Sequence, residues 1–511
     1  MNRFVYAFMV LASVFPVCGH AQTQAASDGN PPVGINLAGV SYWSTELPFV
    51  DIFKISQPLV SQKKGAGYGK GDKHELRDDG YPKQLLPDHH MDSITAACNG
   101  HYPGGDYICL YDGKGKLEFA FDAKAVKQEP GRAELSIVPK DQVAVRIMQT
   151  DPADPIRNIR LVPKPFEKTY EKDPFNPDFL NLWSNMKVIR FMDWMHTNGS
   201  KISDWSDRPK PTDQTQGQKG VALEYMIALC NRLHADPWFC MPHLASDDYV
   251  RNFARMVKER LEPDRRVYIE YSNECWNFIF GQTRYCLEQG KKLKLSDNEF
   301  QAALRYYSQR AVEIFKIGEE VFGGKDRLVR VLSAQGANPW TSEQVLGWQD
   351  AAKKADALAI APYFGYSFGD PKKADEVAQL TVEQLLEQCR AEVAKERERM
   401  AKQAAVAKKF GVKLFAYEAG QHLVGHGGAE NNQKLTDLFF AANRHPIMKD
   451  LYREYLGNWK AVGGDLIMIF SSTGRPSKWG SWGILEYQDQ DSATAPKFQA
   501  VQEFIAGNPK Q

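Results

Sequence analysis

The stretch VYIEYSNECWN, Val267 to Asn277, begins as a β-branched and aromatic run and ends in Asn-Glu followed closely by a tryptophan. Short runs of this composition are typical of β-strands, and runs that are apolar throughout are typical of parallel strands buried on both faces. Glu274 therefore stands where a buried strand ends. The stretch raises two questions: whether it belongs to a larger parallel sheet, and whether a second carboxylate lies at the same edge.

Seven further runs of this kind lie along the chain, and long amphipathic segments separate most of them. In chain order the eight runs are 33–39, 187–194, 236–243, 267–274, 327–335, 356–364, 412–420 and 465–472. Helical patterns between them include 221–234, 299–322 and 380–410, the last of which ends before Gly411 in a C-cap position. Eight strands alternating with helices predict an α/β fold of the (β/α)8, or TIM-barrel, type. The alternative is an open doubly wound sheet, but GINLAG at 34–39 lacks the GxGxxG spacing of a nucleotide-binding turn.

One interval is too long for a barrel connection, because about 150 residues separate the first two runs. Within it, YICLY, DGKG and KLEFAF (107–121) have the pattern of a hairpin, and alternating strand patterns follow. We predict a small antiparallel β insertion over 80–165 on the first βα loop, with the barrel formed by 22–79 and 166–511. Such an insertion would either help to bind a polymer or only cover the barrel.

The first 21 residues have the pattern of a secretory signal peptide. Arg3 precedes an apolar run over 4–17, and small residues end the segment at Ala21. We expect cleavage after Ala21 and a secreted or periplasmic protein. The alternatives are a cytosolic protein with an apolar N-terminus, and a lipoprotein attached through Cys18.

The charge balance bears on the partners of the protein, and the cysteine content bears on its disulfides and metal sites. The 64 Lys and Arg residues balance the 63 Asp and Glu residues, so nothing favours nucleic acid or a membrane as partner. Eight cysteines become seven after cleavage, and Cys98 and Cys109 are the best candidates for a disulfide. No Cys/His spacing indicates zinc, and we expect neither a metal nor a cofactor. The oligomeric state is not indicated.

Two carboxylates occupy the positions where a barrel carries its function, at the carboxyl ends of strands. Glu274 ends the fourth run, and Glu418 ends the seventh, in LFAYEAG (414–420). Strands four and seven lie across the barrel from each other, so both carboxyl groups could face one bond. A retaining glycosidase uses such a pair, about 5–5.5 Å apart, as acid/base and nucleophile.

A barrel with Asn-Glu after its fourth strand and Glu after its seventh resembles clan A of the glycoside hydrolases, a group of retaining (β/α)8 enzymes. The resemblance covers roughly 33–75 and 165–505 and leaves out the insertion. It implies an exported hydrolase that acts by double displacement, with Glu274 as acid/base and Glu418 as nucleophile. The substrate would be a β-linked polysaccharide or oligosaccharide, cleaved internally, and Asn273 would bind the sugar 2-hydroxyl. Apolar neighbours of Glu274 would raise its pKa, as an acid requires.

Further positions follow the clan's pattern. The resemblance implies that Arg190 lies near the nucleophile, that Tyr363 hydrogen-bonds it, and that His243 lines the pocket. Trp479 or Trp482 would be the platform for a sugar ring. Tyr42 and Trp43 follow the first run, where they would either stack on a sugar or pack beneath the insertion.

Each assignment has a structural alternative. Glu274 and Glu418 could be capping or first-turn residues of the next helix, Arg190 could form only an ion pair, and His243 could be a core histidine. Two other functions therefore stay open: a non-catalytic carbohydrate-binding protein on the same barrel, and a structural barrel without activity.

Overall fold

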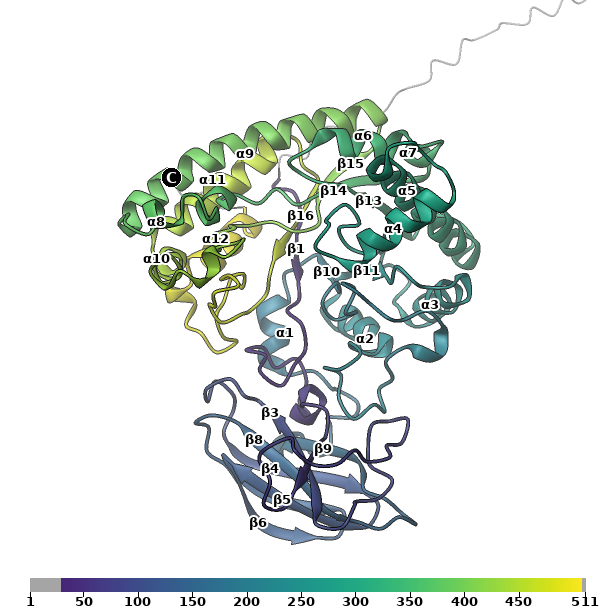
Figure 1. The fold of residues 1–511 in the computed structure, drawn as a ribbon, viewed down its shortest axis with the longest axis vertical. Helices are drawn as coiled ribbons and strands as arrows, with labels where there is room; N and C mark the ends of the chain where they lie inside the picture. Colours follow the sequence, from purple (N-terminus) through teal and green to yellow (C-terminus); the bar gives the residue numbers. More distant parts are fainter. Residues whose placement is uncertain (1–28, 508–511) are drawn as a thin grey trace, which may run out of the picture.

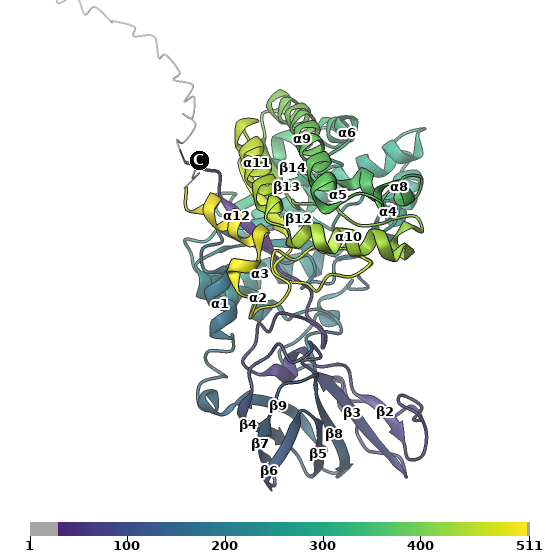
Figure 2. The same cartoon turned by 90° about the vertical axis from the view of Figure 1, so that its left-hand side faces the viewer.

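The stretch before Glu274 forms β12, the fourth strand of a closed parallel barrel; Figure 1 shows the barrel, and Figure 2 labels this strand. The structure is a computed structural model that describes residues 29–507, so the expected signal peptide lies outside the described residues. The barrel strands are β1 (Val33–Asn36), β10 (Val188–Arg190), β11 (Asp236–Met241), β12 (Val267–Tyr271), β13 (Leu328–Ser333), β14 (Ala357–Ile360), β15 (Lys413–Ala416) and β16 (Leu466–Phe470). Each pairs in parallel with the next, and β16 closes on β1, which confirms the predicted (β/α)8 fold.

Helices follow the barrel strands and cover the outside of the barrel (Figures 1 and 2). They are α1 (Pro177–Trp183), α2 (Leu223–Leu233), α3 (Asp247–Arg260), α4 (Gly281–Lys292), α5 (Glu299–Phe322), α6 (Pro339–Gly347), α7 (Ala351–Lys354), α8 (Ala374–Val377), α9 (Val382–Phe410), α10 (Gln433–Arg444), α11 (Ile447–Ala461) and α12 (Pro496–Ile505). The long helix α9 ends as its sequence predicts: Gly411 is the C-cap residue in the left-handed conformation, at φ 73°.

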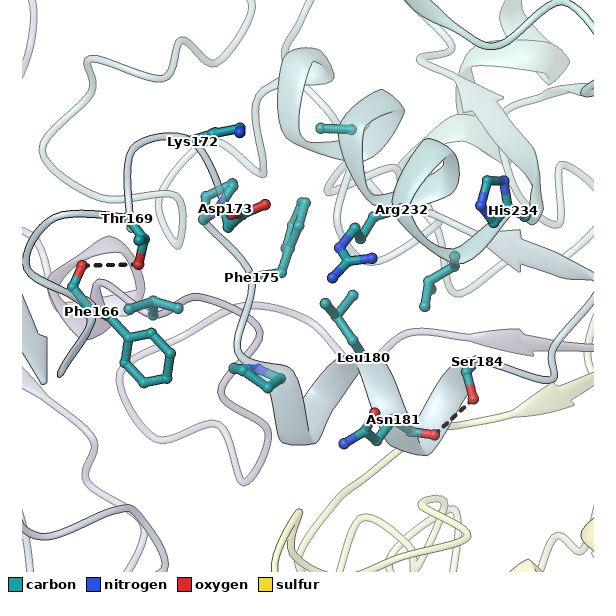
Figure 3. Close-up of a pocket in the computed structure, with 15 residues that line it drawn as sticks. Phe166, Thr169, Lys172, Asp173, Phe175, Leu180, Asn181, Ser184, Arg232 and His234 are labelled. Carbon is teal, nitrogen blue, oxygen red and sulfur yellow. Dashed lines mark hydrogen bonds between the residues drawn. The ribbon is translucent and has the colours of Figure 1, made fainter.

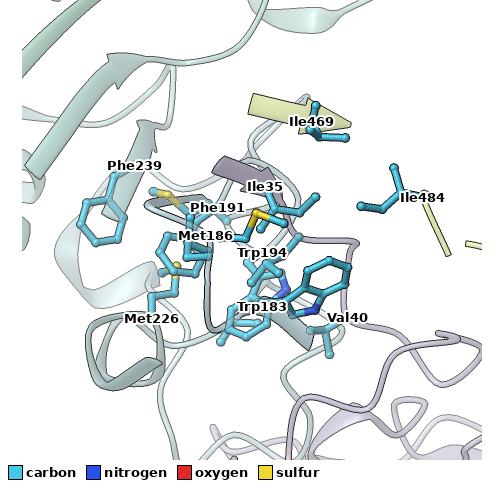
Figure 4. Packing of buried hydrophobic residues seen from close by; sticks show 14 of the residues in the cluster. Ile35, Val40, Trp183, Met186, Phe191, Trp194, Met226, Phe239, Ile469 and Ile484 are labelled. Atoms are coloured by element: carbon cyan, nitrogen blue, oxygen red, sulfur yellow. The ribbon is translucent and has the colours of Figure 1, made fainter. Parts of the chain in front are cut away.

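Side chains alternate between two cores along each barrel strand, because successive residues of a strand point to opposite faces. One cluster fills the interior of the barrel and includes Val188, Tyr268, Val329 and Val331. The other lies between the strands and the helices. Figure 4 shows part of it, where Ile35 and Phe191 pack with the buried rings of Trp183 and Trp194. This alternation decides which polar residues of the strands point into the barrel.

The insertion between β1 and β10 forms two four-stranded antiparallel sheets. Their strands are β2 (Val60–Lys63), β3 (His89–Thr95), β4 (Gly105–Asp112), β5 (Gly115–Phe121), β6 (Ala123–Glu129), β7 (Arg132–Ile137), β8 (Val143–Thr150) and β9 (Arg157–Pro163). The strands thus begin at Val60, ahead of the expected start at residue 80. The hairpin predicted over 107–121 is wrong: β4 pairs with β7 and β9, whereas β5 pairs with β8, so the DGKG turn passes from one sheet to the other.

The insertion, called the β module below, is joined to the barrel by buried contacts (Figure 2). Asp51, in the connection after β1, accepts hydrogen bonds from the backbone N–H of Phe53 at 3.1 Å and of Leu161 on β9 at 2.7 Å. The backbone N–H of Val50 donates to Pro174, in the segment that returns to the barrel. Buried side chains of both parts belong to one hydrophobic cluster, so the module and the barrel pack as a unit.

The cysteines of the described residues are all buried free thiols. The predicted Cys98–Cys109 disulfide is therefore wrong. The Cys98 thiol donates to the carbonyls of Ala96 and His101 in the loop after β3, whereas Cys109 lies in the middle of β4, within the core of the module. Nearness in sequence did not bring the two thiols together. Within residues 29–507 no helix is long and apolar enough to cross a membrane.

Candidate active site

Five polar side chains meet where the barrel strands end: Asn36, Arg190, Asn273, Glu274 and Glu418. Asn36 and Arg190 are the last residues of β1 and β10, and the others follow β12 and β15 directly. The alternation along the strands turns Asn36 and Arg190 into the barrel, because the neighbours on either side of each residue belong to the outer core. The sequence therefore brings these groups together through strand register alone.

Arg190 is the centre of this cluster and is fully buried. Its Nη1 donates to Asn36 at 2.9 Å and to Glu418 at 3.0 Å. Its Nη2 donates to Asn273 and to Glu270, both at 2.9 Å, and its Nε donates to Glu270 at 3.2 Å. A guanidinium has five N–H donors, so every donor of Arg190 is used.

Glu270, in the strand β12, forms an ion pair with Arg190 at 2.9 Å and is itself fully buried. The carboxylate also accepts hydrogen bonds from Trp238 Nε1 at 2.9 Å and from the Ser333 hydroxyl. A buried charge is tolerated only when it is paired and hydrogen-bonded. Glu270 meets this condition, and it holds the guanidinium plane in one orientation.

Two side chains donate hydrogen bonds to the carboxylate of Glu418. Arg190 donates to Oε1, and the Tyr363 hydroxyl, from the loop after β14, donates to Oε2 at 2.9 Å. The Glu418 side chain is only 8% exposed. Both carboxylate oxygens are thus aimed by donors on other strands.

Glu274 is held differently, by neutral donors. The Tyr417 hydroxyl donates to Oε1 at 2.9 Å, and the Asn277 amide donates to Oε2 at 2.8 Å. The backbone at Glu274 adopts φ 44°, a left-handed conformation that a residue with a side chain rarely takes and that costs on the order of 1–2 kcal/mol. Such conformations persist where the surrounding structure imposes them, often at functional sites.

Neither glutamate is a helix cap. The helix after Glu274 is α4, which begins at Gly281 with Phe280 as its N-cap. After Glu418 the chain runs through a loop to a short 3-10 turn, and α10 has Asn432 as its N-cap. The capping alternative is therefore wrong for both carboxylates.

The charges around the pair indicate where a proton resides. Burial raises the pKa of Glu274, and the hydrogen bonds from Asn277 and Tyr417 lower it in part. Burial also raises the pKa of Glu418, Arg190 lowers it, and the charge of Glu274 raises it. An ion pair favours the charged form of a carboxyl group. Arg190 donates to Glu418 and not to Glu274, so this contact favours Glu418 as the ionised member of the pair.

Other predicted residues lie close to this cluster. Asn273 is buried, and its amide donates to Asn198 at 3.1 Å while its oxygen accepts from Arg190. His243 follows β11, and burial lowers its pKa to about 4, so its ring is neutral at neutral pH. The Trp482 ring lies 5.7 Å, centre to centre, from the ring of Tyr363, whose hydroxyl donates to Glu418.

Three predicted aromatic residues lie further out. Trp479 is 64% exposed. The Lys478 ammonium lies over its ring in a cation–π contact. The rings of Tyr42 and Trp43 contact each other, and the backbone oxygen of Tyr42 accepts a hydrogen bond from Ala97 of the β module. The Tyr42 backbone therefore contacts the module, the Trp43 side chain is 54% exposed, and no hydrogen bond joins either residue to either glutamate.

Several residues of the site were not singled out from the sequence: Asn36, Asp193, Glu270 and Tyr417. A signal for Glu270 was present, because a carboxylate inside the buried run VYIEY needs a partner, and Arg190 is a cation inside another such run. Asp193 follows β10 by three residues. Burial raises its pKa to about 6, and it lies close enough to Glu418 to raise the pKa of that carboxyl group.

The described part of the chain contains no group of His, Cys, Asp and Glu side chains arranged to hold a metal ion. Two cavities of about 560 and 580 Å³ lie elsewhere in the molecule, and neither is lined by Glu274 or Glu418. Figure 3 shows the first, between α1, α2 and the segment that leads from the β module back to the barrel.

No protein-family model and no curated protein matches the chain. Among solved structures, the chain is similar to a 4-O-α-L-rhamnosyl-β-D-glucuronidase from Fusarium oxysporum 12S, solved as a Rha-GlcA complex. That match covers 67% of each chain at 13% identity and a TM-score of 0.41. An endo-β-1,4-mannanase from Thermotoga petrophila is similar over 65% of this chain and 74% of its own, at 12% identity and a TM-score of 0.36. A Bacteroidetes-affiliated GH5 cellulase linked with a polysaccharide utilization locus is similar over 66% of this chain and 85% of its own, at 10% identity and a TM-score of 0.39. These likenesses concern the fold alone.

Proposed function

We propose that the chain is an exported retaining glycoside hydrolase that cleaves β-linked glycans by double displacement. One observation carries the proposal: a half-buried glutamate after β12 and a buried glutamate after β15 are held by donors of different charge. Arg190 and Tyr363 bind Glu418, whereas Tyr417 and Asn277 bind Glu274. Environments that separate two carboxyl groups in this way assign one as acid and the other as nucleophile.

In the first step, Glu418 attacks the anomeric carbon while Glu274 gives its proton to the leaving glycosidic oxygen. The bond between that carbon and the oxygen breaks, and a glycosyl ester forms on Glu418. Arg190 keeps Glu418 ionised and orients it for the attack. Asp193 is a further carboxyl group whose charge acts on Glu418, and it would help to stabilise the positive charge that develops on the sugar.

In the second step, Glu274 is ionised and takes a proton from a water molecule, which attacks the same carbon and releases Glu418. Both glutamates return to their starting states. Asn273 is the candidate partner of the sugar 2-hydroxyl, and its contacts with Arg190 and Asn198 fix the plane of its amide.

We propose internal cleavage of a chain rather than removal of single end units. Support comes from exposed aromatic side chains in the loops that follow barrel strands. Trp43 follows β1, Tyr366 follows β14 and Trp479 follows β16, and they are 54%, 54% and 64% exposed. Flat apolar rings match the C–H faces of sugars, so rings outside the catalytic pair suit units beyond the one that is cleaved.

The proposal is tested by incubating the purified protein with a panel of neutral β-linked polysaccharides and measuring reducing-sugar release. On a substrate that is cleaved, Glu418→Gln should lose at least about 10⁴-fold in kcat, the scale seen when a nucleophile is removed. Proton NMR of the first products should show retention of the anomeric configuration. An inverted product would contradict double displacement.

A carbohydrate-binding protein without activity would give a different result. Glycans would bind, no polysaccharide of the panel would release reducing sugar, and Glu418→Gln would change neither outcome. Asp350→Asn is a suitable control, because Asp350 lies before α7, away from the carboxyl ends of the strands.

A further inference from the structure

A second polar cavity lies where the β module meets the barrel. The cavity has a volume of about 580 Å³, within the range of about 300–1,000 Å³ that is usual for ligand pockets. Its walls come from the connection after β1, from the module strands β4 and β9, and from the barrel helix α2. It therefore exists only because the two parts of the chain pack together.

The charges that line the cavity cancel. Four cationic and four anionic side chains contribute to the walls. Half of them pair with one another: Arg77 with Asp79 at 3.1 Å, and Arg160 with Asp112 at 2.9 Å. An anionic ligand would meet the carboxylates and a cationic ligand the guanidinium groups. The lining thus favours a ligand without net charge.

Two groups of the wall, the buried Asp51 and the half-buried Lys54, retain unused hydrogen-bonding capacity. Asp51 is 5% exposed; its Oδ1 accepts two backbone hydrogen bonds, but its Oδ2 has no partner within residues 29–507. The Lys54 ammonium donates to the Pro211 carbonyl at 2.8 Å, and an ammonium has three donors. A ligand that brings both donors and acceptors would satisfy both groups, and hydroxyl groups do so.

Aromatic side chains complete the wall. Tyr225 of α2 and Tyr170 line the cavity, and the Phe49 ring packs against Tyr225 with 5.0 Å between ring centres. Polar groups of both kinds beside aromatic rings suit a sugar, which has hydroxyl edges and apolar faces.

We propose that this junction cavity is a second binding site for a neutral glycan, which holds a part of the polymer away from the catalytic pair. The proposal rests on the proposed glycoside hydrolase activity. It gives the β module a role in binding the polymer, since Arg77, Asp112 and Arg160 belong to the module.

Asp51→Asn tests this with a minimal change of shape. The Asn oxygen still accepts the two backbone hydrogen bonds, but an amide N–H₂ replaces the free acceptor. We expect kcat/KM on the polysaccharide to fall about tenfold, the effect of losing one hydrogen bond to a charged group. On a small aryl glycoside of the same sugar, kcat/KM should stay at the wild-type value, because that substrate does not reach the cavity.

Tyr170→Ala is a second variant, to be used if Asp51→Asn unfolds at a lower temperature than the wild type. The matched control is Arg232→Met, which changes the wall of the neighbouring cavity of similar size (Figure 3). It should leave kcat/KM on both substrates unchanged. Wild-type values on the polysaccharide for both Asp51→Asn and Tyr170→Ala would overturn the proposal.

A binding assay separates this proposal from the catalytic one. Wild-type protein and the Asp51→Asn, Tyr170→Ala and Glu418→Gln variants are titrated with neutral oligosaccharides by calorimetry. One outcome would support the junction cavity and contradict the catalytic proposal. In that outcome no glycan is hydrolysed, the wild type and Glu418→Gln bind the oligosaccharide, and Asp51→Asn does not. Absence of binding to any neutral oligosaccharide, or tighter binding of an acidic one, would overturn the cavity's assignment.

Discussion

Arg190 on β10 and Arg330 on β13 are both buried and both bind two carboxylates, but they lie on opposite sides of the barrel wall. Arg330 stands between Val329 and Val331, which fill the barrel interior, so its side chain points outward. There it binds Asp356 at 2.8 Å and Glu319 of α5 at 2.7 Å. Arg190 points inward and reaches the candidate nucleophile.

The partners of the two arginines differ as much as their directions. The side chains of Asp356 and Glu319 are 31% and 29% exposed, so water shares in their solvation. Glu270 is fully buried, and Glu418 is nearly so. The outward ion pairs tie a helix to the sheet, whereas the inward ones act on the charge of the candidate nucleophile. An ion pair alone therefore says little about function. The face of the strand on which the arginine lies decides whether it can reach the candidate site.

Of the changes that test this comparison of the two arginines, replacing Arg190 should have the largest effect. In Arg190→Met, Glu270 would remain as an uncompensated buried charge, which costs about 3–5 kcal/mol of folding stability. Glu418 would also lose the cation that keeps it ionised, so kcat should fall about 10³-fold or more. Thermal unfolding and steady-state kinetics measure the two effects.

The double variant Arg190→Met/Glu270→Met separates stability from catalysis. Removing both charges should recover most of the lost thermal stability, because no unpaired charge is left. Activity should stay as low as in Arg190→Met. Recovery of activity in the double variant would mean that Arg190 acts only through folding.

Glu270→Gln should have the next largest effect, as Glu270 positions Arg190 without touching substrate. We expect kcat to fall roughly 10- to 100-fold, as losing about 1.5–3 kcal/mol of a charged hydrogen bond would give. The negative charge of Glu270 raises the pKa of Glu274. Its removal should lower that pKa and move the alkaline limb of the kcat/KM profile to lower pH. The matched variant Asp356→Asn, at a partner of Arg330, should leave the profile in place.

The two tyrosines should move opposite limbs of the pH profile. The Tyr417 hydrogen bond lowers the pKa of Glu274, so Tyr417→Phe should raise it and move the alkaline limb to higher pH. The Tyr363 hydrogen bond lowers the pKa of Glu418, so Tyr363→Phe should move the acidic limb to higher pH. Each variant should lose about tenfold in kcat. A shift of the same limb in both variants would contradict the assigned roles.

Arg330→Met should have the smallest effect on catalysis. Its partners are exposed enough to be solvated after the change, so we expect a loss of about 1–3 kcal/mol in folding stability. The kcat and the pH profile should match the wild type at temperatures where the variant is folded. Loss of activity without loss of stability would show that both faces of the wall matter for the reaction.

The barrel, and the position of the two glutamates after its strands, could be predicted because their signals are local. Eight apolar runs and the residues that end them are visible along the chain, and parallel strands place their ends together. The ion pair between Arg190 and Glu270 could not be predicted from the sequence, because it depends on the register between neighbouring strands. Arg190 pairs with Trp238 across β10 and β11, and Glu270 pairs with Cys240 across β11 and β12, and only this alignment brings the two charges side by side.

The β module was predicted less well for the same physical reason. Its strands are visible in the sequence, but their partners are distant, so the DGKG turn was assigned to a hairpin although it links two sheets. The junction cavity has no sequence signal at all. Asp51, Arg77, Arg160 and Tyr225 belong to four separate segments, and only the packing of module on barrel places them around one space.

The central claim is that Glu418 forms a covalent bond to the sugar while Glu274 moves the proton. The most direct test incubates the wild-type protein with an activated 2-deoxy-2-fluoro glycoside of the sugar that the polysaccharide panel identifies, followed by peptide mass spectrometry. The account predicts one glycosyl group on the peptide that contains Glu418, and none in Glu418→Gln. An adduct on another residue, or no adduct from a protein that cleaves the polysaccharide, would contradict it.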